Sequence, residues 1–132
     1  MPAQALAPEH RVAGNQRPIG GTRTVVLHGP EGGIAATAHC YFPHGPHSPH
    51  VRDAWVGLVA VAPEFRGCGL GTRANAEGIR MALDDLGATA VHELVSETNI
   101  ASRRMMERCG LSRDAQRVCA MAIAADSAKF TR

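Results

Sequence analysis

The stretch of sequence that decides the fold is AWVGLVAVAPEFRGCGLG, residues 54–71. Its first eight residues form an almost unbroken apolar run, which is typical of a β-strand buried on both faces of a sheet. Pro63 ends that strand because proline lacks the backbone N–H that a sheet requires. After a Gly-x-Gly-x-Gly turn, apolar residues recur at helical spacing, at Ile79, Ala82, Leu83 and Leu86. The stretch and its continuation therefore predict a strand, a glycine-rich turn and a helix.

Upstream of this unit, two β-rich runs lie on either side of a short turn. The runs are residues 24–28 and 34–42, and the turn between them, residues 29–33, contains glycine and proline. This pattern predicts an antiparallel hairpin.

Downstream, the sequence predicts a second strand–helix–strand unit. Residues 88–96 have the composition of a strand, and Asn99 is a good N-cap for a helix over 100–109. Residues 118–124 predict the last strand. Hairpin, strand, helix, strand, helix and strand together predict a mixed α/β sheet, because strands joined through a helix lie parallel.

Length, charge and cysteine usage limit the class of protein. The 132 residues predict one domain, with a loose arm or one weakly marked strand at 1–22, the folded domain at 23–125 and a polar tail at 126–132. A net charge of +2 and a pI of about 8.5 are too mild for a nucleic-acid surface. The sequence shows no signal peptide and no apolar run near the ~20 residues that cross a membrane. Four cysteines without a CxxC pair predict free thiols in a cytoplasmic protein.

The glycine-rich turn predicts an anion site. The first turn of a helix has backbone N–H groups without intrahelical acceptors and carries the positive end of the helix dipole. Gly67, Gly69 and Gly71 would let those donors approach a phosphate closely, and Arg66 adds a charged donor. A tight turn that only needs flexible glycines is the alternative. The turn lacks the Gly-Lys-Ser/Thr of a Walker A loop and the G-x-G-x-x-G of a dinucleotide site.

Two motifs resemble the GNAT superfamily of acyl-CoA-dependent N-acetyltransferases. Val61-x-Pro63-x-x-Arg66-Gly67-x-Gly69-x-Gly71 is similar to the principal CoA-binding motif of that family. Asn99-x-x-Ser102, followed by Cys109-Gly110-Leu111, is similar to its second motif. The two motifs span Trp55–Leu111. The resemblance implies a GNAT-like sheet, acetyl-CoA as acyl donor and an amine as acceptor.

The resemblance also implies which residues bind acetyl-CoA. Backbone amides of the turn would hold the pyrophosphate, the central strand would pair with the pantetheine arm, and Asn99 would bond the arm from the other side. The implied residues are Val59, Ala60, Val61, Arg66, Gly67, Cys68, Gly69, Leu70, Gly71, Thr72, Asn99 and Ser102. Arg73, Arg103 and Arg104 are candidates for the 3′-phosphate, although a solvated helix face explains them equally well.

The catalytic groups are less clear from the sequence. The position of the family's usual acid, a tyrosine in the second-motif helix, is Met106, which has no proton to donate. Ser102, Cys109 or water would then have to protonate the thiolate. Glu93 and Glu97 are the candidate bases, with His92 and Asp53 as further options, and an ordinary polar strand is the alternative reading of this segment. A non-catalytic acyl-CoA-binding module is therefore the second hypothesis.

Two further segments carry expectations. The loop with His44, His47 and His50 predicts either a solvated connection, a metal contact or an acceptor contact, and no metal is assigned to it. The family normally has a strand and two helices before the hairpin, and only about twenty-two residues stand there. N-terminal helices are therefore expected to be reduced or absent, and a homodimer is expected to cover the exposed edge.

Overall fold

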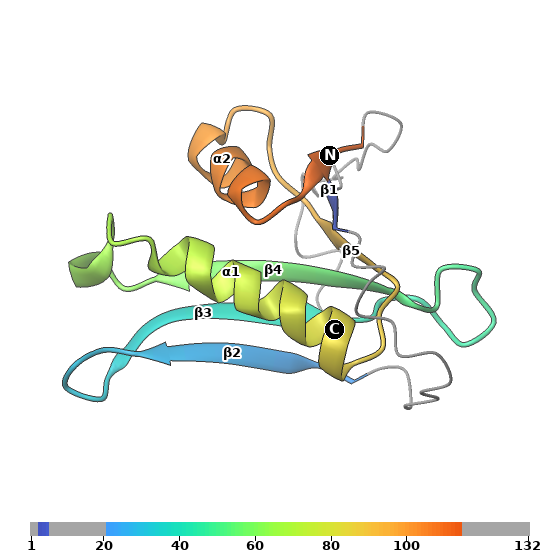
Figure 1. Ribbon diagram of the computed structural model, residues 1–132, viewed down its shortest axis with the longest axis horizontal. Helices are drawn as coiled ribbons and strands as arrows, with labels where there is room; N and C mark the ends of the chain where they lie inside the picture. The colour runs from blue at the N-terminus through green and yellow to red at the C-terminus, as the bar shows by residue number, and fades with distance from the viewer. Residues whose placement is uncertain (1–2, 6–20, 115–132) are drawn as a thin grey trace, which may run out of the picture.

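The computed structural model describes residues 3–5 and 21–114, which form a mixed α/β fold (Figure 1). A sheet with the strand order β2-β3-β4-β5-β1-β6 is its centre. The strands are β1 (Ala3–Ala5), β2 (Arg23–His28), β3 (Ile34–Tyr41), β4 (Asp53–Val61), β5 (Ala90–Glu93) and β6 (Ser112–Arg113). The helices are the 3₁₀ turn Pro63–Phe65, α1 (Leu70–Arg80), the π-helical turn Met81–Asp85 and α2 (Ile100–Arg108).

The strand directions confirm the fold predicted from the sequence. β2 and β3 pair as an antiparallel hairpin, and β3 pairs antiparallel with β4. β5 lies parallel to β4, as expected for two strands joined through α1. The elements of the central strand–turn–helix unit therefore stand where the apolar pattern predicts them.

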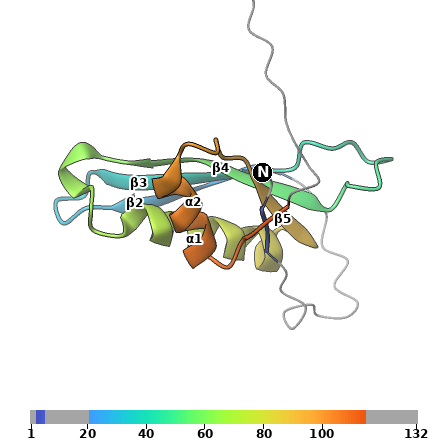
Figure 2. The same ribbon diagram turned by 90° about the horizontal axis from the view of Figure 1, so that it is seen from above.

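α1 packs closely on one face of the sheet (Figure 2). Gly78 allows this approach, because a Cβ at that position would lie 3.2 Å from Cγ1 of Val56 and 3.6 Å from Cβ of Ala38. The buried core between helix and sheet is aliphatic and rich in alanine, and Met106 and Leu111 extend it to α2 and the segment that follows. The core thus fixes both helices on the same side of β4 and β5.

One strand boundary, one helix type and one additional strand differ from the prediction. The strand expected over 88–96 is only Ala90–Glu93, because the chain leaves the sheet where β4 and β5 diverge. The helix after the glycine turn does not stay α-helical, since it widens into a π-turn closed by a Leu86 N–H to Met81 O bond of 3.0 Å. β6 was not predicted, and the strand expected over 118–124 lies outside the described residues.

Part of the N-terminal segment forms a strand, which was one of the two predictions for residues 1–22. Ala3–Ala5 pairs antiparallel with β5 on one side and with β6 on the other. β1 therefore lies between β5, the strand before α2, and β6, the strand after it. The sequence pattern does not predict this insertion.

Candidate functional site

β4 and β5 separate after three paired residues and leave an open edge on β4. The pairs are Asp53 with Ala90, Ala54 with Val91 and Trp55 with His92. β4 continues to Val61, so residues 56–61 have no partner on β5 (Figure 1). Backbone groups on such an edge can pair with an extended ligand as an added strand would. The predicted arm-binding residues, Val59–Val61, lie in this unpaired half.

A β-bulge interrupts the other edge of β4 at the same level. Thr37 pairs with Ala60 and His39 with Gly57, so Leu58 and Val59 together face the single residue Ala38. Leu58 has a φ of 52° and is 79% exposed. A non-glycine residue in this left-handed conformation is strained, and strain of this kind gathers at functional sites. The bulge therefore marks the middle of β4 as a place where backbone groups are turned away from the regular ladder.

The strain at Leu58 has a measurable consequence for stability. Leu58→Gly should leave the free energy of unfolding nearly unchanged, because relief of the left-handed conformation, about 1 kcal/mol or more, offsets the extra entropy of glycine. Ala60→Gly, two residues along the same strand, should cost about 1 kcal/mol because nothing is relieved there. Urea unfolding of the two variants tests this. A Leu58→Gly variant that loses as much stability as Ala60→Gly would contradict the strain.

The glycine turn directly follows the open edge and leaves the start of α1 uncapped. Gly67 and Gly69 have φ values of 80° and 77°, and Gly69 is the N-cap of α1 without any side-chain cap hydrogen bond. The first bond across this end runs from Arg73 N–H to Gly69 O, 3.1 Å, so the amides of residues 70–72 have no intrahelical acceptor.

The surroundings of the turn also suit a negatively charged ligand. No acidic side chain lies in the first turn of α1, and Arg66, Gly67, Cys68 and Gly69 are exposed. Gly71 lies against the open strand, where an added Cβ would be 3.3 Å from Cγ2 of Val61. Donors of the turn and the free edge of β4 are therefore continuous with each other.

The polar groups at the start of α2 are partly engaged in hydrogen bonds within the chain. Oδ1 of Asn99 accepts the Ser102 N–H at 3.1 Å, which is the predicted N-cap and leaves only the Nδ2 amide of Asn99 for an arm. Arg103 donates to the carbonyl of Glu97 at 3.1 Å. Arg73 and Arg104 are exposed and lie on different helices.

The predicted catalytic residues do not converge on one point. Glu97 is exposed and accepts from Arg113 at 2.8 Å, and Ser102 belongs to the first turn of α2. Glu93 is buried against α1, where its Oε2 accepts from Nδ2 of Asn75 at 2.9 Å. Burial raises the pKa of Glu93 to about 7, although the bond from Asn75 acts in the opposite direction. Asn75 was missed by sequence reasoning, because a lone asparagine within a helix gives no signal.

Met106, on α2, and Cys109, at its C-cap, pack at the core between α2 and α1. Met106, at the position of the family's tyrosine, is buried in the core and presents no proton donor. The Cys109 thiol donates to the carbonyl of Thr72 at 3.4 Å and so ties α2 to the first turn of α1. Burial raises the pKa of the Cys109 thiol, and the nearby Glu93 acts in the same direction.

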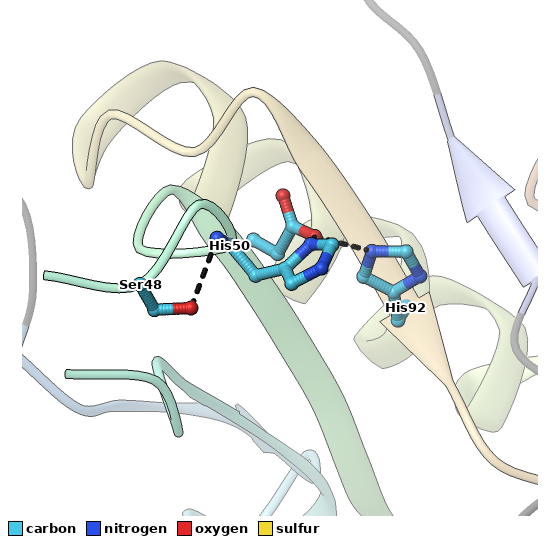
Figure 3. A network of polar contacts seen from close by, with 4 residues as sticks. Ser48, His50 and His92 are labelled. Atoms are coloured by element: carbon cyan, nitrogen blue, oxygen red, sulfur yellow. Dashed lines mark hydrogen bonds and ion pairs between the residues drawn. The ribbon is translucent and has the colours of Figure 1, made fainter.

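β4 and β5 diverge beyond Trp55 and His92, and we call the paired side of this divergence the closed end of the gap. There, a carboxylate joins two histidines (Figure 3). Oδ2 of Asp53 lies 3.0 Å from Nδ1 of His50 and 3.2 Å from Nε2 of His92. Ser48 Oγ accepts the backbone N–H of His50 at 3.0 Å and holds the end of the histidine-rich loop. The described part of the chain contains no group of three or more His, Cys, Asp or Glu arranged to hold a metal ion. It also contains no helix long and apolar enough to cross a membrane.

Comparison with solved structures finds the same fold in several acetyltransferases. A spermidine N-acetyltransferase chimera from Vibrio cholerae and hSSAT superposes with a TM-score of 0.60 at 17% identity, over 71% of this chain and 54% of that one. A glucosamine-6-phosphate N-acetyltransferase from Arabidopsis thaliana gives 0.59 at 22% identity, over 80% and 67%. An integron cassette protein from the mobile metagenome of V. cholerae gives 0.65 at 13% identity, over 83% and 66%. The chain thus spans about half the length of the spermidine enzyme chimera.

The sequence itself was compared with protein families and with curated proteins. No curated protein matches it. The family model described as acetyltransferase (GNAT) family matches residues 5–111, which include the open edge of β4, the glycine turn and both helices. This chain therefore belongs to the GNAT acetyltransferase family.

Proposed function

We propose that this chain binds acetyl-CoA and transfers its acetyl group to an amine. The observation that carries the proposal is the continuity of two unsatisfied backbone surfaces, the uncapped start of α1 and the unpaired half of β4. Amides of residues 67–72 would bind the pyrophosphate, with Arg66 at the rim. The pantetheine arm would then follow Val59–Val61 and bring the thioester towards the closed end of the gap.

The chemistry needs few side chains. The amine nitrogen attacks the thioester carbonyl carbon, the carbon–sulfur bond breaks, and CoA leaves as a thiolate while the amine loses a proton to a base. A backbone N–H near the bulge at Leu58 would stabilise the developing oxyanion. A thiol has an ordinary pKa of about 8.5, so a thiolate can leave near neutral pH with little help. Met106 has no proton to donate, so its presence at this position reduces the expected rate without preventing the reaction.

A non-catalytic acyl-CoA-binding module is the second candidate, and Met106 is the observation that favours it. Two measurements distinguish the candidates. Calorimetric titration with acetyl-CoA measures binding, and release of the free CoA thiol in the presence of a set of amines measures turnover. A suitable set contains the amines after which four structurally similar N-acetyltransferases are named. These are spermidine, glucosamine 6-phosphate, phosphinothricin and an aminoglycoside. We expect micromolar binding and thiol release with at least one amine. Binding without release would support the module, and no binding at millimolar acetyl-CoA would refute both.

Two expectations from the sequence accompany this proposal. A homodimer would cover sheet surface such as the edge strand β2, where Val26 is 38% exposed. A cytoplasmic location fits the free thiols of Cys40, Cys68 and Cys109.

A further inference from the structure

Two neighbouring side chains at the closed end of the gap carry buried polar atoms without partners. Trp55 and His92 are the last residue pair before β4 and β5 separate, and their ring centroids are 5.5 Å apart. Nε1 of Trp55 and Nδ1 of His92 are buried and make no hydrogen bond within the described chain. Buried polar atoms nearly always have a partner, so these two atoms indicate that a ligand or a water completes the site.

The hydrogen bond to Asp53 determines which nitrogen of His92 is free. A carboxylate only accepts, so the contact of 3.2 Å places the hydrogen of the neutral imidazole on Nε2 (Figure 3). Nδ1 then keeps its lone pair and can accept a proton. Asp53 also accepts from His50 and is held by two rings, which restricts its own movement. A carboxylate that fixes the tautomer of a histidine in this way is a known means of preparing a base.

The remaining candidates for a base are less well placed. Glu97 is occupied by Arg113, and Glu93 points to the helix face of the sheet, where Asn75 binds it. His92 belongs to the opposite face, since its neighbours Val91 and Glu93 point towards the core and α1. The titratable groups near the His92 ring in the described chain are Asp53 and His50, with His44 behind His50.

We propose that His92, held by Asp53, is the general base that deprotonates the acceptor amine. The inference rests on the proposed acetyl transfer and assigns it a residue. The ammonium N–H proton passes to Nδ1 of His92, directly or through one water. One water can relay the proton because His92 is only 2% exposed. The lone pair that remains on the amine nitrogen forms the nitrogen–carbon bond. The two electrons of the broken carbon–sulfur bond leave on sulfur, as the thiolate of CoA. His92 is then the catalytic residue, and Asp53 is a positioning residue.

His92→Gln tests the catalytic residue, because glutamine can still donate to Asp53 but cannot act as a base. With the best acceptor of the amine set, kcat should fall at least about 100-fold. Wild-type kcat/KM should decline towards acid pH more steeply than protonation of the amine alone requires, since the imidazolium has no lone pair, and the variant should follow protonation of the amine alone. The affinity for acetyl-CoA should change less than about threefold, because the pyrophosphate and arm contacts lie on other residues.

Asp53→Asn tests the positioning residue with His92 intact. The asparagine amide can donate to Nε2 and so favours the tautomer with a hydrogen on Nδ1, which predicts a similar loss of kcat. His28→Gln is the control, because His28 is exposed at the turn of the hairpin and, among the described residues, its side chain bonds only the carbonyl of Gly32.

The possible outcomes separate this inference from the proposed function. If wild type turns over and both His92→Gln and Asp53→Asn keep kcat and the additional decline at acid pH, this inference is refuted and acetyl transfer stands. If wild type binds acetyl-CoA without turnover, both are refuted. If His92→Gln does not fold, Asp53→Asn decides through the same pH profile.

Discussion

Gly69→Ala is expected to lower the affinity for acetyl-CoA at least about 100-fold. Gly69 caps α1 with a φ of 77°, and an added Cβ would stand in open space beside the exposed turn, where the pyrophosphate would approach the amide donors. Displacing the pyrophosphate from two of these donors removes two charge-assisted hydrogen bonds, each of about 1.5–3 kcal/mol. Each 1.4 kcal/mol is a factor of ten in the dissociation constant. Calorimetric titration with acetyl-CoA measures the change.

The hairpin glycine Gly32 provides a matched control for this variant. Its φ is 84° and an added Cβ would likewise have no atom within 4 Å. Alanine in the left-handed conformation costs roughly 1–2 kcal/mol at either position, so Gly32→Ala and Gly69→Ala should lose similar stability. Only Gly69→Ala should lose affinity. Equal affinity in the two variants would mean that the glycines serve only to let the chain turn, and the proposed pyrophosphate site would be refuted.

The fold was predictable because its decisive segments are local. An apolar run, a proline and three glycines mark β4, its end and the start of α1, and the structure places these elements at Asp53–Val61 and Leu70–Arg80. Asn99 caps α2 as its side-chain chemistry predicts. The end of β5 does not follow from local pattern, since strand propensity continues through Val95 while the strand stops at Glu93. What ends β5 is divergence from β4, a tertiary effect that no local pattern contains.

The candidate site was predictable in its backbone and not in its side chains. The glycines of the sequence indicate where backbone amides are exposed. The turn at Gly67 and Gly69 has the left-handed geometry that only glycine adopts easily. The pairs Asn75 with Glu93 and Asp53 with His92 join residues 18 and 39 positions apart in the chain. Such contacts depend on strand register and helix packing, so the sequence could name Asp53 and His92 as options but could not choose between them and Glu93.

Glu93→Gln is expected to stabilise the protein at pH 8 and to remove most of its loss of stability between pH 5 and pH 8. Burial raises the pKa of Glu93 from 4.5 to about 7, so the folded state binds this proton more tightly than the unfolded state. The resulting stability is complete below pH 4.5 and is lost as the pH rises through 7. Such a rise in pKa corresponds to about 3 kcal/mol.

The contacts of Glu93 explain why the neutral form is favoured. Oε1 of Glu93 and Oδ1 of Asn75 are both buried without a partner, and an ionised carboxylate has no donor for either. Protonation supplies one donor, as does the amide of glutamine at every pH. Thermal unfolding at pH 5 and pH 8 measures the effect, and we expect Glu93→Gln to raise the pH 8 midpoint by at least about 5 °C. Glu97→Gln, at an exposed glutamate four residues along, should change it little. If wild type and Glu93→Gln lose stability equally between the two pH values, the carboxyl is ionised in the folded protein, and the buried pair with Asn75 must be stabilised as a charged group.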